Sequence, residues 1–95
     1  MLVLVTYDIS NPRALRRTAR LVNAFGTRVQ KSVFECHLTA SQFAYLLRRL
    51  QEERERAPAG SFYSARCYRL GAFPPDRLVV VGDGERTSVS PYLVI

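Results

Sequence analysis

The alternation of apolar and polar positions along the chain predicts several short strands. Leu2–Tyr7 is rich in β-branched residues and apolar on both faces, as is typical of a central strand covered on two sides. Arg28–Leu38 alternates between polar and apolar residues, and a tight turn near Lys31–Ser32 would divide it into two strands. Two further strands are predicted at Phe62–Leu70 and Leu78–Val81, with the turn sequence FPPD between them.

A helical spacing of apolar residues replaces this alternation after the first strand. The buried face of the predicted helix, at positions i, i+3, i+4 and i+7, consists of Leu15, Thr18, Ala19, Val22 and Phe25. Ser10 or Asn11 can cap this helix, with Pro12 in its first position, where the missing N–H of proline costs nothing. Gly26 is expected to end it.

A second helix is predicted after Thr39, which forms a capping-box sequence with Gln42. Its buried face repeats the helical spacing at Phe43, Leu46, Leu47 and Leu50. We expect this helix to stop before Pro58 and Gly60. The charged residues near its end are interpreted as a solvated face, and they are Glu52, Glu53, Arg54, Glu55 and Arg56.

The order of these elements predicts an α+β protein. Strand, helix, two strands, helix and two strands fit a ferredoxin-like βαββαβ sandwich with an extra C-terminal strand. In this fold one antiparallel sheet carries two helices on one face. Residues 1–95 are expected to form a single domain, and residues 83–95, which end in the apolar sequence SPYLVI, a C-terminal tail used in dimer or partner contacts.

Composition and charge narrow the class of partner. The 95 residues are 47% hydrophobic, which excludes disorder as the default, and carry a net charge of +6 from thirteen arginines and one lysine against eight acids. Arginine presents a planar set of donors that suits phosphate, so the charge favours nucleic acid as a partner. A genome that encodes arginine in place of lysine remains an alternative explanation.

The cysteines and the N-terminus bear on location. Cys36 and Cys67 lie far apart without a CxxC partner, so neither a zinc site nor a disulfide framework is indicated. Buried free thiols in a reducing cytoplasm are the favoured interpretation. The first apolar run is too short for a signal peptide, and no apolar stretch approaches the roughly 18 residues that span a bilayer. A cytoplasmic protein without membrane contact is expected.

The first predicted helix has a second, basic face. Arg13, Arg16, Arg17 and Arg20 follow the same i, i+3, i+4, i+7 spacing opposite the apolar residues, and the helix contains no acid. Like charges in one row repel each other, so stability alone would favour interspersed glutamates. We interpret the row as a phosphate-contacting surface, with a merely solvated face as the alternative.

Asp8 follows the first strand, where sites form at the edges of sheets. From residue type alone it can either cap the turn before the helix or bind a divalent metal ion, and two copies facing each other across a dimer axis would make a plausible Mg²⁺ site. His37, the only histidine, is interpreted as a structural or surface residue. Asp83 and Glu85 belong to a glycine-flanked turn and are weaker candidates.

Taken together, these residues resemble one family: the small CRISPR-associated adaptation proteins, the second of the two universal Cas proteins. The similarity lies in VTYDIS, the pair Arg16–Arg17, Gly26, RVQKSVFEC and CYRL, in this order and spacing. It implies a ferredoxin-like protomer that forms a homodimer, with the last strand crossing to the other subunit. It also implies a metal-dependent endonuclease acting on RNA or DNA, or alternatively a non-catalytic scaffold that bridges subunits of the CRISPR integrase protein during spacer acquisition.

The same resemblance assigns roles to individual residues. It implies that Asp8 binds Mg²⁺ (or Mn²⁺) and is the catalytic residue. The nucleic-acid-facing positions it implies are Tyr7, Arg17, Arg28 and Phe34, to which the basic row adds the neighbouring Arg16. Relatives often carry an acid at the start of the later strand, whereas this chain has Tyr63 and Ser64, so no metal ligand is assigned there.

Overall fold

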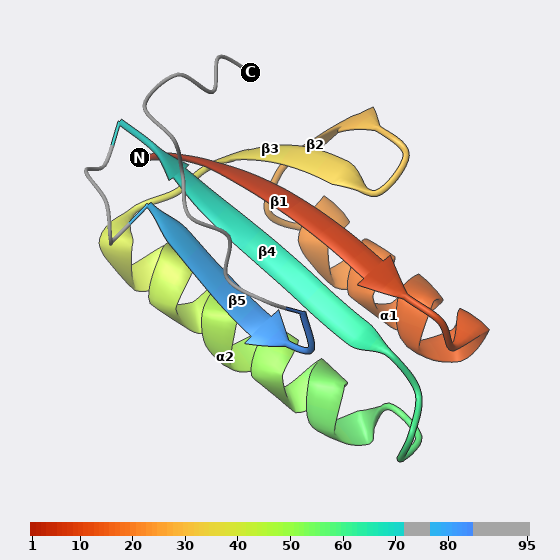
Figure 1. Cartoon of the computed structure of the whole chain (residues 1–95). Coiled ribbons are helices and arrows are strands. Elements are labelled where there is room, and N and C mark those ends of the chain that lie inside the picture. The colour runs from red at the N-terminus through yellow and green to blue at the C-terminus, as the bar shows by residue number, and fades with distance from the viewer. Residues whose placement is uncertain (72–76, 85–95) are drawn as a thin grey trace.

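Strands and helices alternate along the chain in the computed structural model, which describes residues 1–71 and 77–84. In chain order the elements are β1 (Leu2–Ile9), α1 (Pro12–Asn23), β2 (Thr27–Gln30), β3 (Val33–His37), α2 (Ala40–Arg56), β4 (Tyr63–Leu70) and β5 (Leu78–Gly82). The strands form one antiparallel sheet in the order β2-β3-β1-β4-β5, and they pass in front of both helices in Figure 1. The predicted α+β fold class is confirmed.

The side chains of the central strand β1 alternate between the two faces of the sheet. Val3, Val5, Tyr7 and Ile9 point toward the helices and are buried, whereas Asp8, between the last two, is exposed on the other face. This alternation is the expected consequence of the two-residue period of a strand. The face away from the helices, called the open face below, is therefore the one on which Asp8 lies.

Both helices begin with the predicted caps. The Asn11 side chain accepts a hydrogen bond from the Ala14 N–H at 3.0 Å, which identifies Asn11 rather than Ser10 as the cap of α1. At the start of α2, the Thr39 hydroxyl accepts from the Gln42 N–H at 3.2 Å, and the Gln42 side chain accepts from the Thr39 N–H at 2.8 Å. The capping box is confirmed.

The buried faces of the helices agree with the predicted spacing in outline. On α1 the buried residues are Ala14, Thr18 and Val22, while Leu15, Ala19 and, just beyond the helix, Phe25 are partly buried against the core. On α2 the buried residues are Phe43, Leu46, Leu50 and Glu53. Within the described part of the chain, neither helix is long and apolar enough to cross a membrane.

Gly26 does not end α1 in the way the sequence suggests. The helix ends at Asn23, and Gly26 is not among the glycines in the left-handed region. A Cβ atom at Gly26 would lie 2.3 Å from the Glu35 carbonyl oxygen and 2.5 Å from the Cys36 Sγ. Glycine is required here because the chain passes against β3 on its way into β2.

The two cysteines are free and buried, as predicted. Burial raises the pKa of Cys67 to about 12, and it also raises the pKa of Cys36. The predicted turn at residues 73–76 and the tail from residue 85 onward lie outside the described residues.

Candidate metal and nucleic-acid site

Asp8 is the penultimate residue of β1, and its side chain projects from the open face of the sheet. Its direct neighbour across the β1–β4 ladder is Ser64, the second residue of β4. Among the described residues, no hydrogen bond or ion pair engages the Asp8 carboxylate, and Asn11 caps the following helix. The capping role considered for Asp8 is therefore not observed, and its oxygens are available to a ligand.

The described part of the chain contains no complete metal site. In the ranges 1–71 and 77–84, no group of three histidine, cysteine or acidic side chains could hold an ion. His37 lies opposite Leu2, at the other end of β1 from Asp8. Mg²⁺ binds one or two carboxylates and retains several waters, so the exposed Asp8 carboxylate is of the type that such a site uses.

Asp83 has a structural role in this fold. Its carboxylate accepts a hydrogen bond from the Tyr63 N–H at 3.1 Å, and its own N–H donates to the Tyr63 carbonyl oxygen at 2.7 Å. These bonds fix the end of β5 to the start of β4. The Asp83 carboxylate thus stabilises the pairing of β4 with β5, whereas no described residue bonds to the carboxylate of Asp8.

Tyr7, Phe34 and Arg28 lie together on the side of the sheet that faces the helices. The Tyr7 and Phe34 rings stack with centroids 6.2 Å apart, and the Arg28 guanidinium lies 5.3 Å from the Phe34 ring centroid. Phe34 is fully buried and Tyr7 is 7% exposed, whereas Arg28 is exposed on the edge strand β2. Phe34 therefore lies under the Arg28 guanidinium, Tyr7 stacks on Phe34, and Arg28 is the solvent-exposed member of this group.

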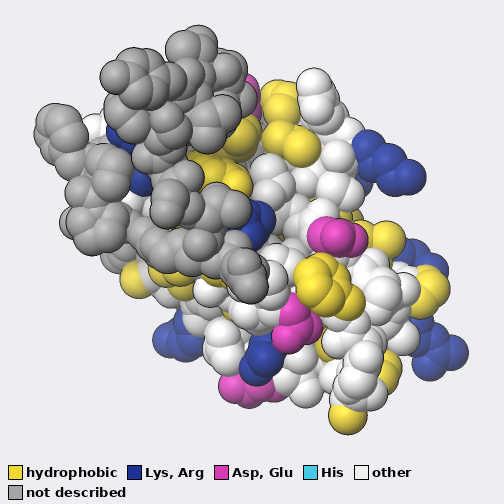
Figure 2. Space-filling view, in the orientation of Figure 1, with side chains coloured by type: hydrophobic (Ala, Val, Ile, Leu, Met, Phe, Trp, Pro, Cys, Tyr) yellow, Lys and Arg dark blue, Asp and Glu magenta, His cyan; other side chains and the backbone are white. Residues whose placement is uncertain are grey.

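The four arginines of α1 are not equivalent. Arg13, Arg16 and Arg20 are exposed, and no ion pair with a described residue involves them. Arg17 is only 26% exposed, because its Nε donates to the Glu53 carboxylate at 2.8 Å. Basic side chains project at the margin of the molecule where α1 and the β2–β3 hairpin lie (Figure 2). The predicted basic face is present, but one of its members is anchored to α2.

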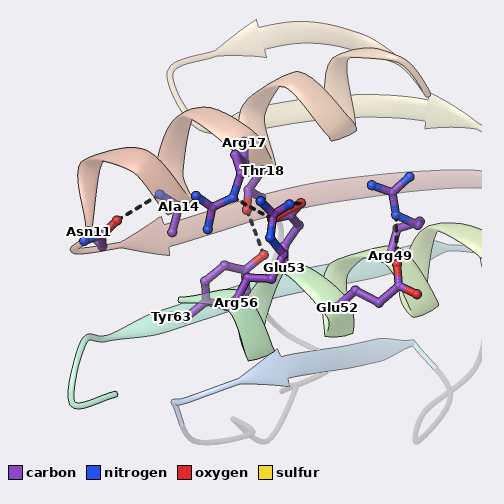
Figure 3. A network of polar contacts seen from close by, with 9 residues as sticks. All are labelled: Asn11, Ala14, Arg17, Thr18, Arg49, Glu52, Glu53, Arg56 and Tyr63. Carbon is purple, nitrogen blue, oxygen red and sulfur yellow. Dashed lines mark hydrogen bonds and ion pairs between the residues drawn. The ribbon is translucent and has the colours of Figure 1, made fainter. Parts of the chain in front are cut away.

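The interpretation of Glu53 as part of a solvated face is wrong. Glu53 is 3% exposed and accepts hydrogen bonds from both Arg17 and Arg56, which approach it from α1 and α2 (Figure 3). The apolar spacing contained the signal that identifies it: Glu53 follows Leu50 by three residues and so continues the buried face of α2.

Comparison with known protein families shows the family to which this chain belongs. Residues 1–72 match the family model described as CRISPR associated protein Cas2. This chain belongs to the Cas2 family.

Individual relatives extend the similarity over the full length. The chain is 40% identical over 100 residues to the CRISPR-associated endoribonuclease Cas2 of Chlorobaculum tepidum, covering all of both proteins. It is 33% identical over 101 residues to the CRISPR-associated endoribonuclease Cas2 1 of Chloroflexus aurantiacus, covering 99% of this chain and 100% of that protein. The crystal structure of Streptococcus pyogenes Cas2 at pH 6.5 is similar with a TM-score of 0.63 and 39% identity, over 75% of this chain and 87% of that one.

A buried hydrogen bond lies next to the Arg17–Glu53 ion pair of this Cas2 family chain. The Thr18 and Tyr63 hydroxyl groups lie 2.8 Å apart, between α1 and β4 (Figure 3). Burial raises the pKa of Tyr63, the bond to Thr18 opposes this shift, and the negative charge of Glu53 adds to it. Sequence spacing placed Thr18 on the buried face but gave no indication of its partner, because Tyr63 is distant in sequence.

Proposed function

We propose that this Cas2 family chain is a metal-dependent endonuclease that hydrolyses phosphodiester bonds of RNA or DNA as a homodimer and acts in CRISPR adaptation. The observation that carries the proposal is the exposed Asp8 carboxylate without a described partner at the end of β1. The relatives matched over their whole length are named endoribonucleases, which supports the reaction class. The buried free thiols support a reducing, cytoplasmic location.

The proposed metal site contains two copies of Asp8, one from each protomer of the dimer. A two-fold axis brings the same surface of both subunits together, so one exposed carboxylate per chain is sufficient. When bound, Mg²⁺ or Mn²⁺ would polarise the scissile phosphate and lower the pKa of a water molecule. The carboxylates of Asp8 would hold the ion at the end of β1.

The arginines supply the binding surface in this proposal. Arg16 and Arg17 on α1, with Arg28 on β2, are donors for backbone phosphates. Phe34 contributes by supporting Arg28, since its ring lies under the guanidinium, and Tyr7 contributes by stacking on Phe34. Contacts of this kind do not read sequence, so a preference for particular bases is not expected from them.

Substitution of the carboxylate tests the enzymatic proposal. Asp8→Asn should reduce cleavage of a labelled RNA strand in Mg²⁺ to the level seen in EDTA, while binding stays nearly unchanged. Glu35→Gln is the matched control, because Glu35 is another exposed acid on the open face, in β3. Cleavage by Asp8→Asn at the wild-type rate would contradict the proposal.

A second candidate is a non-catalytic scaffold that binds DNA and bridges subunits of the CRISPR integrase protein. It is favoured by the exposed arginines of α1 together with the incomplete metal site of a single described protomer. Spacer acquisition in cells separates the two candidates. Loss of acquisition with Asp8→Asn supports the enzyme, whereas full acquisition with the same variant supports the scaffold.

A further inference from the structure

A cleft of about 490 Å³ lies between the start of α1 and the end of α2. Four arginines line it, three from α1 and one from α2, together with Asn11 and Pro58: Arg13, Arg16, Arg17 and Arg56. Two hydrogen bonds join the segment before α1 to the segment before β4, next to the lining residue Asn11. The Ser10 N–H donates to the Phe62 carbonyl oxygen at 3.0 Å, and the Phe62 N–H donates to the Ser10 hydroxyl at 2.9 Å. These bonds connect the segment that leads into α1 with the segment that follows α2, and each segment contributes a lining residue, Asn11 and Pro58.

The Glu53 carboxylate holds two of these arginines from below. Its Oε1 accepts from the Arg17 Nε at 2.8 Å, and its Oε2 accepts from the Arg56 Nη1 at 3.3 Å. Two guanidiniums at such short range would repel each other in the absence of a carboxylate between them. A buried carboxylate is itself costly unless it is paired, and here both partners are in place.

The hydrogen bonds to Glu53 leave much of both guanidiniums unused. Among the described residues, no hydrogen bond engages the two Nη nitrogens of Arg17, and Glu53 accepts only from the Nη1 of Arg56. The Arg56 side chain is 61% exposed and that of Arg17 is 26% exposed. Both residues can therefore donate to an anion in the cleft without releasing Glu53.

We propose that Glu53 is a positioning residue that holds Arg17 and Arg56 as a pair, and that this pair binds one backbone phosphate of a nucleic acid in the cleft between α1 and α2. The inference rests on the proposed function insofar as a nucleic acid is the ligand. It adds Arg56 to the binding surface and assigns to Glu53 a role beyond joining two helices. Arg13 and Arg16 provide further positive charge along the same cleft.

The Arg56 contact is tested by binding in EDTA, which prevents metal-dependent cleavage. The probes are a short labelled DNA duplex and a labelled RNA strand, titrated over a range of salt concentrations. Arg56→Gln should weaken binding about three- to tenfold and flatten the slope of log K against log salt by about one. Arg54→Gln is the matched control: it removes the same charge from an exposed site on the same helix, but Arg54 lines a different cavity.

Glu53→Gln tests the positioning role of Glu53. A role in positioning the arginines and an effect of total charge alone predict opposite changes in binding affinity. Removal of a negative charge beside a cationic cleft should tighten binding if only the total charge matters. If Glu53 orients the pair, the amide keeps only one acceptor oxygen, and binding should weaken with a flatter salt slope. Tighter binding by Glu53→Gln with an unchanged slope would overturn the positioning role.

Comparison of the variants with the wild-type chain separates failure of this inference from failure of the proposed function. Equal effects of Arg56→Gln and Arg54→Gln would overturn the phosphate contact, and this comparison decides the matter even if Glu53→Gln fails to fold. Thermal unfolding of each variant establishes its fold. Failure of the wild-type chain to bind either probe would contradict the proposed function itself, whereas normal wild-type binding with unaffected variants contradicts only this inference.

Discussion

At the scale of a single residue, Gly26 is the position where the smallest change should have a large structural effect. An added methyl group would lie 2.3 Å from the Glu35 carbonyl oxygen, which belongs to the backbone of β3 and cannot move away alone. Gly26→Ala should therefore lower the free energy of unfolding by about 2 kcal/mol or more. Urea denaturation of both proteins measures the difference.

Gly60 provides the comparison for this prediction. Gly60 has a φ of +84° but no atom within contact distance of an added Cβ. Gly60→Ala should cost about 1 kcal/mol, from backbone strain alone. If the two substitutions are equally destabilising, then the close approach of Gly26 to β3 is not what requires glycine there.

The carboxylates of Asp8 and Glu53 show which parts of the candidate sites could be predicted from residue type and spacing. The position of Asp8 at the end of a strand is predictable, whereas spacing alone could not decide that Asn11, and not Asp8, caps α1. Glu53 could be placed on the buried face by spacing alone. Its two partners could not, because Arg17 is on another helix and an ion pair between distant residues leaves no local pattern.

At the scale of an element, α2 depends on its first turn as the sequence predicts. The Thr39 hydroxyl satisfies the Gln42 N–H, which would otherwise be unpaired at the helix start. Thr39→Ala should reduce the free energy of unfolding by about 1 kcal/mol. Thr39→Ser, which keeps the hydroxyl, should restore most of the loss. Equal destabilisation by both substitutions would indicate that the threonine methyl group, not the cap, is important.

Strands were harder than helices to interpret from sequence. The pattern at Arg28–Leu38 correctly predicts two strands, but the register between β2 and β3 shifts between Arg28 and Gln30. This irregular register pairs Arg28 directly with Phe34, so that the guanidinium lies over the ring. Hydrophobic alternation cannot predict such a shift, because an extra residue in one strand changes the pairing of the backbone without changing the apolar pattern.

At the scale of the whole molecule, the order of elements was sufficient to predict the fold. A βαββαβ order with short connections allows few arrangements, and the observed sheet places β1 between β3 and β4. The distribution of candidate residues over the two faces follows from this sheet. Asp8 lies on the open face, while Tyr7 and Phe34 lie on the helix side. A proposed metal site and the Arg28 surface are therefore on opposite sides of one sheet.

Shared use of Asp8 by two subunits makes a quantitative prediction. If each active site needs both carboxylates, activity should follow the square of the wild-type fraction when wild-type and Asp8→Asn subunits exchange freely. An equal mixture, unfolded and refolded together, should retain about a quarter of the wild-type activity per total protein. Independent sites with one Asp8 each would instead retain about half.

The control for this experiment is an equal mixture with Glu35→Gln, which should retain full activity, since Glu35 lies beside Leu4, farther along the sheet from Asp8. Sedimentation of the wild-type chain should first show a dimer under the assay conditions. A monomer that cleaves RNA would contradict the shared site. If an active dimer instead retains half of the wild-type activity in the mixture with Asp8→Asn, one Asp8 carboxylate per site is enough for cleavage. The Asp8 of the second subunit would then not contribute to that site.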